Sequence, residues 1–167
     1  MAEVIKVYQE SLPELRLIGK RYTSRDRDLA GGFGSHWKKW WEKDYFAQLE
    51  KLGPAREIDD STLGFMRVEE EFEYWIGMFF PKDTPVPEGF ESLDLAPGVI
   101  GTCWIYGRED RGELYGMEAH EICVERISEQ GWRIPEHPVV FERYNCPRFT
   151  TPDAQGKVIL DYCIYLA

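Results

Sequence analysis

Residues Pro138 to Tyr144 read Pro-Val-Val-Phe-Glu-Arg-Tyr, and the rest of the sequence is organised around this stretch. Its β-branched and aromatic residues predict a short β-strand. Because side chains alternate between the two faces of a strand, Glu142 shares a face with Val140 and Tyr144. A carboxylate on a largely apolar strand either points into water at a sheet edge or lies in a pocket that receives a ligand. The strand by itself leaves both alternatives open.

The length and composition of the chain indicate one globular domain over residues 1–167. A chain of 167 residues can form one proper core or two small fused halves. Hydrophobic residues make up 43% of the chain and aromatic residues 14%, including 6 Trp and 9 Tyr. This aromatic content exceeds what a core alone needs, so we expect aromatic side chains to line a pocket.

The charge of the chain limits its partners. The formal net charge is -10, and Lys and Arg form no long run. We therefore expect no nucleic-acid binding by the chain itself and no membrane binding. A small aromatic ligand, cationic or neutral, stays open as the partner. The oligomeric state, monomer or homodimer, is not fixed by the sequence.

The cysteines and histidines form no metal-binding pattern. The four cysteines include no C-x-x-C pair, and the sequence has neither a signal peptide nor a long apolar run. We expect reduced thiols in a cytoplasmic protein. His36, His120 and His137 never stand at a liganding spacing, so we expect no metal and no cofactor. His120 is expected on the polar face of a helix and not in catalysis.

Each half of the chain predicts the order strand, helix, strand, strand. A linker with three prolines, residues 81–89, separates half-repeats of about 1–81 and 90–167. In the first half the helix has Ser35 as its N-cap and Gly53-Pro54 as its end, and Leu12-Pro13 interrupts the opening strand. The predicted elements are, in order, an opening strand through Val4–Val7 and Leu15–Tyr22, a helix from Ser35 to Leu52, strands Leu63–Glu69 and Phe72–Phe80, a strand through Leu95–Tyr106, a helix Glu113–Gln130, and strands Val139–Tyr144 and Val158–Tyr165.

The two halves form a weak internal repeat, in which Ile18-Gly19 matches Ile100-Gly101. Two β-α-β-β units that each leave one sheet face uncovered can pair across a pseudo-twofold axis. We therefore predict an α+β fold in which two pseudo-symmetric β-α-β-β units form a concave antiparallel sheet. Its two helices lie on the outer face, and a central ligand cleft lies between the halves.

Five short motifs, spread over nearly the whole chain, resemble one known family, the GyrI-like small-molecule-binding domains. These domains, also called effector-binding domains, occur alone or behind the DNA-binding part of bacterial multidrug-sensing regulators. None of the motifs is diagnostic by itself. They are Leu15–Tyr22, Tyr74-Trp75-Ile76-Gly77, Ala96-Pro97-Gly98, Phe141–Tyr144 and Ile159–Ile164.

The resemblance implies a ligand class and a place for it. Members of the family typically bind bulky, flat, often cationic hydrophobes, and the glutamate of the Phe/Tyr-Glu-x-Tyr strand lies in their pocket. That position is Glu142 here, with Tyr144 two residues further on. The sequence has no room for a helix-turn-helix before residue 4 or after residue 167, so we expect a stand-alone member.

Three functions are open for such a member. The first is a binder that senses or sequesters a drug or toxin. The second, implied by stand-alone relatives that act on cyclopropane-bearing DNA-alkylating toxins, is a hydrolase in which Glu142 activates water. The third is a protein-interaction modulator of an enzyme partner. A buried carboxylate must find a partner or take up a proton, and a bound cation can be that partner.

Aromatic residues on the predicted strands and the first helix complete the candidate site. If the helix covers Phe72, Tyr74, Ile76 and Met78, then Trp75 and Phe79 face the pocket. One tryptophan of the first helix, Trp37 or Trp40, is expected at the cleft wall, and the pair Trp104 and Tyr106 could face either way. The candidate ligand-binding residues are Glu142, Tyr144, Trp75, Phe79, Trp40, Trp37, Trp104 and Tyr106, and the catalytic candidates are Glu142 and Tyr144.

Overall fold

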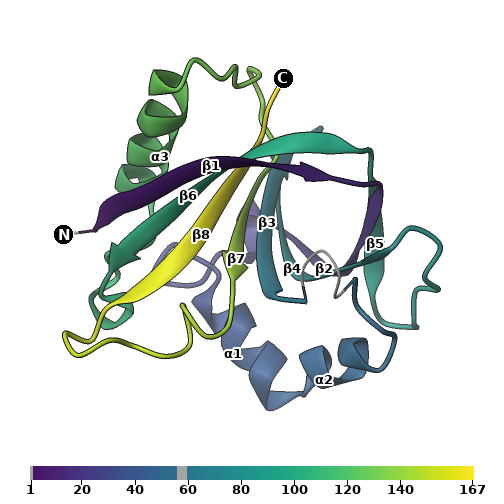
Figure 1. Cartoon of the computed structure of the whole chain (residues 1–167). Coiled ribbons are helices and arrows are strands. Elements are labelled where there is room, and N and C mark those ends of the chain that lie inside the picture. Colours follow the sequence, from purple (N-terminus) through teal and green to yellow (C-terminus); the bar gives the residue numbers. More distant parts are fainter. Residues whose placement is uncertain (1, 56–59) are drawn as a thin grey trace. The chain divides into compact units, whose positions relative to one another are not determined.

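The computed structural model describes residues 2–55 and 60–167 (Figure 1). It divides into two compact units, one of residues 13–97 and the other of residues 1–12 and 98–167. In the described part of the chain each unit contains four antiparallel strands and at least one α-helix. The predicted α+β class with antiparallel strands is confirmed. The organisation of residues 1–167 as one effector-binding domain stays a prediction.

The unit of residues 13–97 contains a β-α-β-β core and one further strand. Its strands lie in the order β3-β4-β2-β5. Its elements are β2 (Leu15–Thr23), α1 (Gly34–Glu42), α2 (Tyr45–Glu50), β3 (Thr62–Val68), β4 (Phe72–Pro81) and β5 (Glu91–Leu95).

The single helix predicted from Ser35 to Leu52 is wrong, because the chain forms two helices there. Asp44 has a left-handed backbone with φ 55°, which ends α1 and redirects the chain into α2. The predicted N-cap is also wrong, since α1 begins at Gly34 with Phe33 as its N-cap. A carboxylate oxygen of Asp28 instead accepts the backbone N–H of Ser35 at 3.1 Å.

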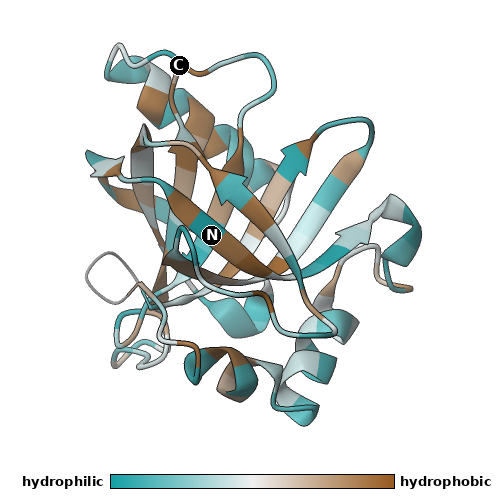
Figure 2. Ribbon diagram, turned by 90° about the vertical axis from the view of Figure 1, so that its right-hand side faces the viewer, coloured by the Kyte–Doolittle hydropathy of each residue, from teal (hydrophilic) through white to brown (hydrophobic). Residues whose placement is uncertain are grey.

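The core of this unit lies between α1, α2 and one face of β2 and β4. Ile18, Trp40 and Tyr74 belong to its buried cluster, together with Ile76 and Met78. The prediction that helix packing claims Tyr74, Ile76 and Met78 is therefore confirmed. In Figure 2 the hydrophobic residues lie mainly on the strands, whereas the connecting loops are largely hydrophilic.

The second unit contains the other β-α-β-β core, also with one further strand. Its strands lie in the order β1-β6-β8-β7. Figure 1 shows α3 beside β1 and β6, with which it is in contact. Its elements are β1 (Glu3–Leu12), β6 (Gly98–Gly107), α3 (Met117–Glu129), β7 (Val140–Tyr144) and β8 (Val158–Tyr165).

The prediction of one opening strand through Val4–Val7 and Leu15–Tyr22 is wrong. The chain breaks at Leu12-Pro13, as predicted, but β1 then pairs with β6 in one unit and β2 with β4 and β5 in the other. The predicted strand Leu95–Tyr106 is likewise two strands, since β5 ends at Leu95 and β6 begins at Gly98. Proline lacks an N–H to donate to a ladder, which favours a break at both places.

The predicted helix Glu113–Gln130 is four residues shorter at its start. Gly112 and Gly116 have φ values of 66° and 94°, which a helix does not contain, so α3 begins at Met117. Its buried side faces the sheet through Ala119, Cys123 and Ile127. No helix in residues 2–55 and 60–167 combines the length and apolar character needed to cross a lipid bilayer.

Trp40 and Trp41 give a matched test of the core beneath α1. Trp40 is fully buried, whereas Trp41 is 59% exposed. Trp40→Ala should lower the free energy of unfolding by about 3–5 kcal/mol because it leaves a large cavity. Trp41→Ala should cost about 1 kcal/mol or less. Urea unfolding followed by circular dichroism measures both, and equal losses would contradict this assignment of the core.

Candidate functional site

The carboxylate of Glu142 is buried in the unit of residues 1–12 and 98–167. Glu142 lies on β7 and is only 8% exposed. Its register partner on β8 is Tyr162, so the two side chains rise from opposed positions on one face of the sheet. The predicted sharing of a face by Glu142 and Tyr144 also holds, because Tyr144 donates its hydroxyl to Glu142 Oε1 at 3.2 Å.

This single hydrogen bond leaves the negative charge of Glu142 poorly compensated. Among the described residues no Lys, Arg or His forms an ion pair with it. Burial therefore raises the pKa of Glu142 from an ordinary value of 4.5 to about 7, and the bond from Tyr144 offsets only part of this rise. The carboxyl group changes its charge in the neutral pH range.

Three further aromatic residues lie near the carboxyl group or near its hydrogen-bond donor, Tyr144. Burial raises the pKa of Tyr162, and the charge of Glu142 raises it further. The pKa of Tyr115 is raised mainly by burial, then by the charge of Glu109 and then by that of Glu142. The ring of Phe149 packs edge-on against Tyr144 at 4.9 Å between centroids. The Glu142 site, by which we mean Glu142 with Tyr115, Tyr144, Phe149 and Tyr162, is thus an anion among aromatic rings.

The hydroxyl of Tyr162 is hydrogen-bonded to Nδ1 of His120 on α3. His120 is half-buried, and desolvation lowers its pKa, while nearby Glu121 opposes this effect. Sequence reasoning placed His120 on a polar helix face and did not consider Tyr162. The period-2 pattern of residues 158–165 shows which face Tyr162 shares within its own strand, but only the pairing with β7 brings it beside Glu142.

A second buried carboxylate in the same unit has the opposite environment. Asp161, next to Tyr162 on β8, is fully buried and accepts hydrogen bonds from Arg143 at 2.9 Å and from Arg148 at 2.9 and 2.5 Å. Arg143 also donates to Glu10 at 2.6 Å. These ion pairs tie β7, β8 and β1 together on the face opposite Glu142, and they leave Arg143 directed away from it.

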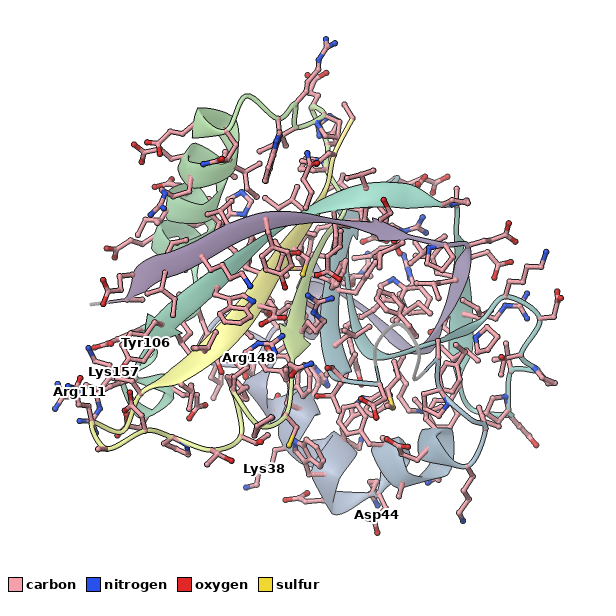
Figure 3. The ribbon with its side chains drawn as sticks, in the orientation of Figure 1. Lys38, Asp44, Tyr106, Arg111, Arg148 and Lys157 are labelled. Atoms are coloured by element: carbon pink, nitrogen blue, oxygen red, sulfur yellow. The ribbon has the colours of Figure 1, made fainter. Side chains whose placement is uncertain are left out.

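Trp104 and Tyr106 lie on the face that carries Asp161, because Trp104 pairs with Asp161 in the register of β6 and β8. Trp104 donates its indole N–H to Tyr8 at 3.2 Å, and the Arg148 guanidinium lies 4.6 Å from its ring centroid. Figure 3 shows Tyr106 beside Lys157, whose ammonium lies 5.0 Å from the ring centroid. Neither aromatic residue shares a sheet face with Glu142.

The remaining predicted aromatics belong to the unit of residues 13–97. Trp75 and Phe79 lie on the face of β4 opposite α1 and are buried there, with the Trp75 indole donating to Glu73 at 2.9 Å. Trp40 is buried in the core and donates to Tyr22 at 3.0 Å, and half-buried Trp37 donates to Tyr74 at 2.8 Å. Contact of any of these residues with a ligand stays a prediction.

No protein-family model matches the sequence, and no curated protein matches it. Solved structures do match. SAV2435 bound to tetraphenylphosphonium is 14% identical with a TM-score of 0.74, over 98% of this chain and 94% of that chain. A Staphylococcus aureus MU50 protein named for bacterial transcription regulation is 16% identical with a TM-score of 0.70, over 97% and 98%. The chain has the GyrI-like fold.

A third GyrI-like structure is part of a larger chain. The cryo-EM structure of an EcmrR–DNA complex is 13% identical with a TM-score of 0.59, and the match covers 96% of this chain but 57% of that chain. At these low sequence identities the structural similarity establishes the fold and not the function. The fold resemblance that the sequence motifs indicated is confirmed.

The unusual pKa of Glu142 predicts a pH-dependent cost to stability. Because its folded-state pKa of about 7 lies above the ordinary 4.5, the folded state binds the proton more tightly, and stability falls as the pH rises through this window. The full cost above pH 7 is about 3 kcal/mol. Glu142→Gln, which keeps the shape and removes the charge, should be more stable than the wild type by up to about 3 kcal/mol near pH 8.

The same comparison near pH 4.5 provides the control. There the wild-type carboxyl group is largely protonated in the folded state, so the gain from Glu142→Gln should shrink to about 1 kcal/mol or less. Urea unfolding of both proteins at the two pH values measures the difference. A gain that does not depend on pH would contradict the raised pKa.

Proposed function

We propose that this chain binds a bulky, flat, hydrophobic cation at the Glu142 site and so senses or sequesters a drug or toxin. The observation that carries the proposal is the buried Glu142 carboxylate, which has one phenolic hydrogen bond and no cationic partner among the described residues. An organic cation would supply the missing charge without the large hydration cost of a small ion.

The surroundings of Glu142 support a flat, aromatic-compatible ligand. Tyr115, Tyr144, Phe149 and Tyr162 supply rings that can stack on an aromatic body or attract a cation through their π-faces. SAV2435, whose fold this chain shares, was solved with tetraphenylphosphonium, a bulky hydrophobic cation with four phenyl rings arranged tetrahedrally around phosphorus. Tetraphenylphosphonium is therefore the first probe.

Binding of tetraphenylphosphonium should become tighter as the pH rises. Only the ionised carboxylate attracts the cation, so the Kd should fall about tenfold per pH unit below pH 7 and level off above it. Quenching of tryptophan fluorescence measures the Kd between about pH 5.5 and pH 8.5. In Glu142→Gln the Kd should be higher than in the wild type near pH 8 and nearly independent of pH.

A neutral ligand of similar shape, triphenylphosphine oxide, separates charge from shape. Its Kd should not fall as the pH rises, because its P=O oxygen can accept a hydrogen bond only from the protonated carboxyl group, and it should change little in Glu142→Gln, whose amide N–H can donate instead. Equal losses of both ligands in this variant would contradict charge pairing at Glu142, and tight pH-independent binding of the cation by the wild type would do the same.

The pKa of about 7 also favours a second candidate, hydrolysis of a cyclopropane-bearing DNA-alkylating toxin. A carboxylate with a pKa near the working pH is well suited to act as a general base. Glu142 would take a proton from water as the water oxygen bonds to one carbon of the strained ring, while Tyr144 holds the carboxylate. The ring C–C bond at that carbon would break, its electron pair would go to the leaving carbon and the group conjugated with it, and protonation there would complete the addition of one water. Mass spectrometry of such a toxin after incubation tests this, since hydrolysis adds one water and Glu142→Gln should abolish it. No feature of the described residues favours the third alternative, a protein-interaction modulator.

A further inference from the structure

Three phenols surround the Glu142 carboxyl group, but only one of them donates to it. Tyr144 provides the hydrogen bond at 3.2 Å. The hydroxyl of Tyr115 is directed to Glu109 at 3.5 Å, and that of Tyr162 is bonded to His120. The weak hydrogen bonding of Glu142 therefore depends on where its neighbours hold their hydroxyl groups.

Tyr162 is the neighbour best placed to donate to Glu142 instead. The two residues are direct register partners on β7 and β8, and such partners have Cβ atoms about 4.5–5.5 Å apart. Both side chains rise on the same face, and Tyr162 is buried. A phenol and a carboxylate in this arrangement can form a strong charge-assisted hydrogen bond, which the structure does not contain.

The position of His120 on α3 explains why this bond is missing. The buried side of α3, with Ala119, Cys123 and Ile127, fixes the helix against the sheet. This packing brings Nδ1 of His120 to the Tyr162 hydroxyl. Because burial lowers its pKa, the ring is neutral near pH 7, and with its proton on Nε2 it presents Nδ1 as an acceptor.

We propose that His120 is a positioning residue for the Glu142 site. By holding the Tyr162 hydroxyl at α3, His120 withholds a second hydrogen bond from Glu142 and keeps the carboxylate available for a cationic ligand. The groups that face Glu142 are Tyr144 on its own strand, Tyr162 on β8 and Tyr115 ahead of α3, with Glu109 beside Tyr115 and Glu121 beside His120.

The consequence is a site that discriminates by charge, and this consequence rests on the proposed function. A carboxylate with one donor gains much from a bound cation, whereas a carboxylate with two donors is already stabilised and gains less. His120 would thus raise the preference for cations over neutral ligands of equal shape without touching the ligand.

The test measures the pKa of Glu142 in the ligand-free protein by NMR titration of its ¹³C-labelled carboxyl group. In His120→Leu the freed Tyr162 hydroxyl should turn to Glu142 and lower its pKa by about one pH unit. In the double variant His120→Leu with Tyr162→Phe the pKa should return to the wild-type value. His120→Gln, whose amide oxygen can still accept the proton, should stay close to the wild type. If His120→Leu does not fold, His120→Ser has a side chain too short to reach Tyr162 and takes its place.

Two results would overturn the proposal. One is a Glu142 pKa that is the same in His120→Leu and in the wild type, and the other is an equal fall with and without the Tyr162 hydroxyl. Because these titrations contain no ligand, they decide the role of His120 even if tetraphenylphosphonium fails to bind. If it binds, His120→Leu should lower the ratio of its affinity to that of triphenylphosphine oxide near pH 8 by about threefold to tenfold, and an unchanged ratio would contradict the effect on specificity.

Discussion

The burial of Glu142 with little compensation is the constraint on which this account depends. A buried carboxylate costs several kcal/mol unless it is paired or protonated. The same unit contains both outcomes, since Asp161 one position from Tyr162 is held by Arg143 and Arg148, whereas Glu142 has one phenol. The ion pairs of Asp161 stabilise the fold, whereas the carboxylate of Glu142 would be stabilised by a bound cation.

The two β-α-β-β units have corresponding positions, and only one of these positions carries a buried glutamate that has no ion pair among the described residues. In one unit Arg143 pairs with Asp161 across β7 and β8, and in the other Arg67 pairs with Glu73 across β3 and β4. The next residue pair is Glu142 with Tyr162 in the first unit and Met66 with Tyr74 in the second. Thus the ion pair occurs in both units, whereas the position of Glu142 in one unit is occupied by Met66 in the other.

The tyrosines at these corresponding positions both bond to the helix of their own unit. Tyr74 accepts the indole N–H of Trp37 on α1, and Tyr162 bonds to His120 on α3. The repeated bond fixes each helix on its sheet, and at Tyr162 it also determines what is left for Glu142. The helix–tyrosine hydrogen bond therefore supports packing in both units, and in the unit of Glu142 it also affects the electrostatics of the carboxyl group.

The sequence predicts the strand of Glu142 and the face shared with Tyr144, because alternation along one strand is a local property. It also predicts the β-α-β-β order of each half. Ile18-Gly19 lies on β2 and Ile100-Gly101 on β6, and each of these strands pairs with the further strand of its unit, β5 or β1, which agrees with the repeat.

The failures concern long-range pairing and local backbone geometry. β1 joins the unit that begins again at residue 98, which no local pattern indicates. The left-handed Asp44 interrupts an otherwise helical pattern. Tyr162 and His120 were missed for the same reason as β1, since their proximity to Glu142 arises from strand register and helix docking.

Proton release on ligand binding tests the central claim most directly. Calorimetric titration of tetraphenylphosphonium near pH 7, in buffers with different ionisation enthalpies, gives the number of protons released per bound cation. If Glu142 has a pKa of about 7 and pairs with the cation, about half a proton should be released by the wild type and none by Glu142→Gln. Binding without proton release in the wild type would contradict the account.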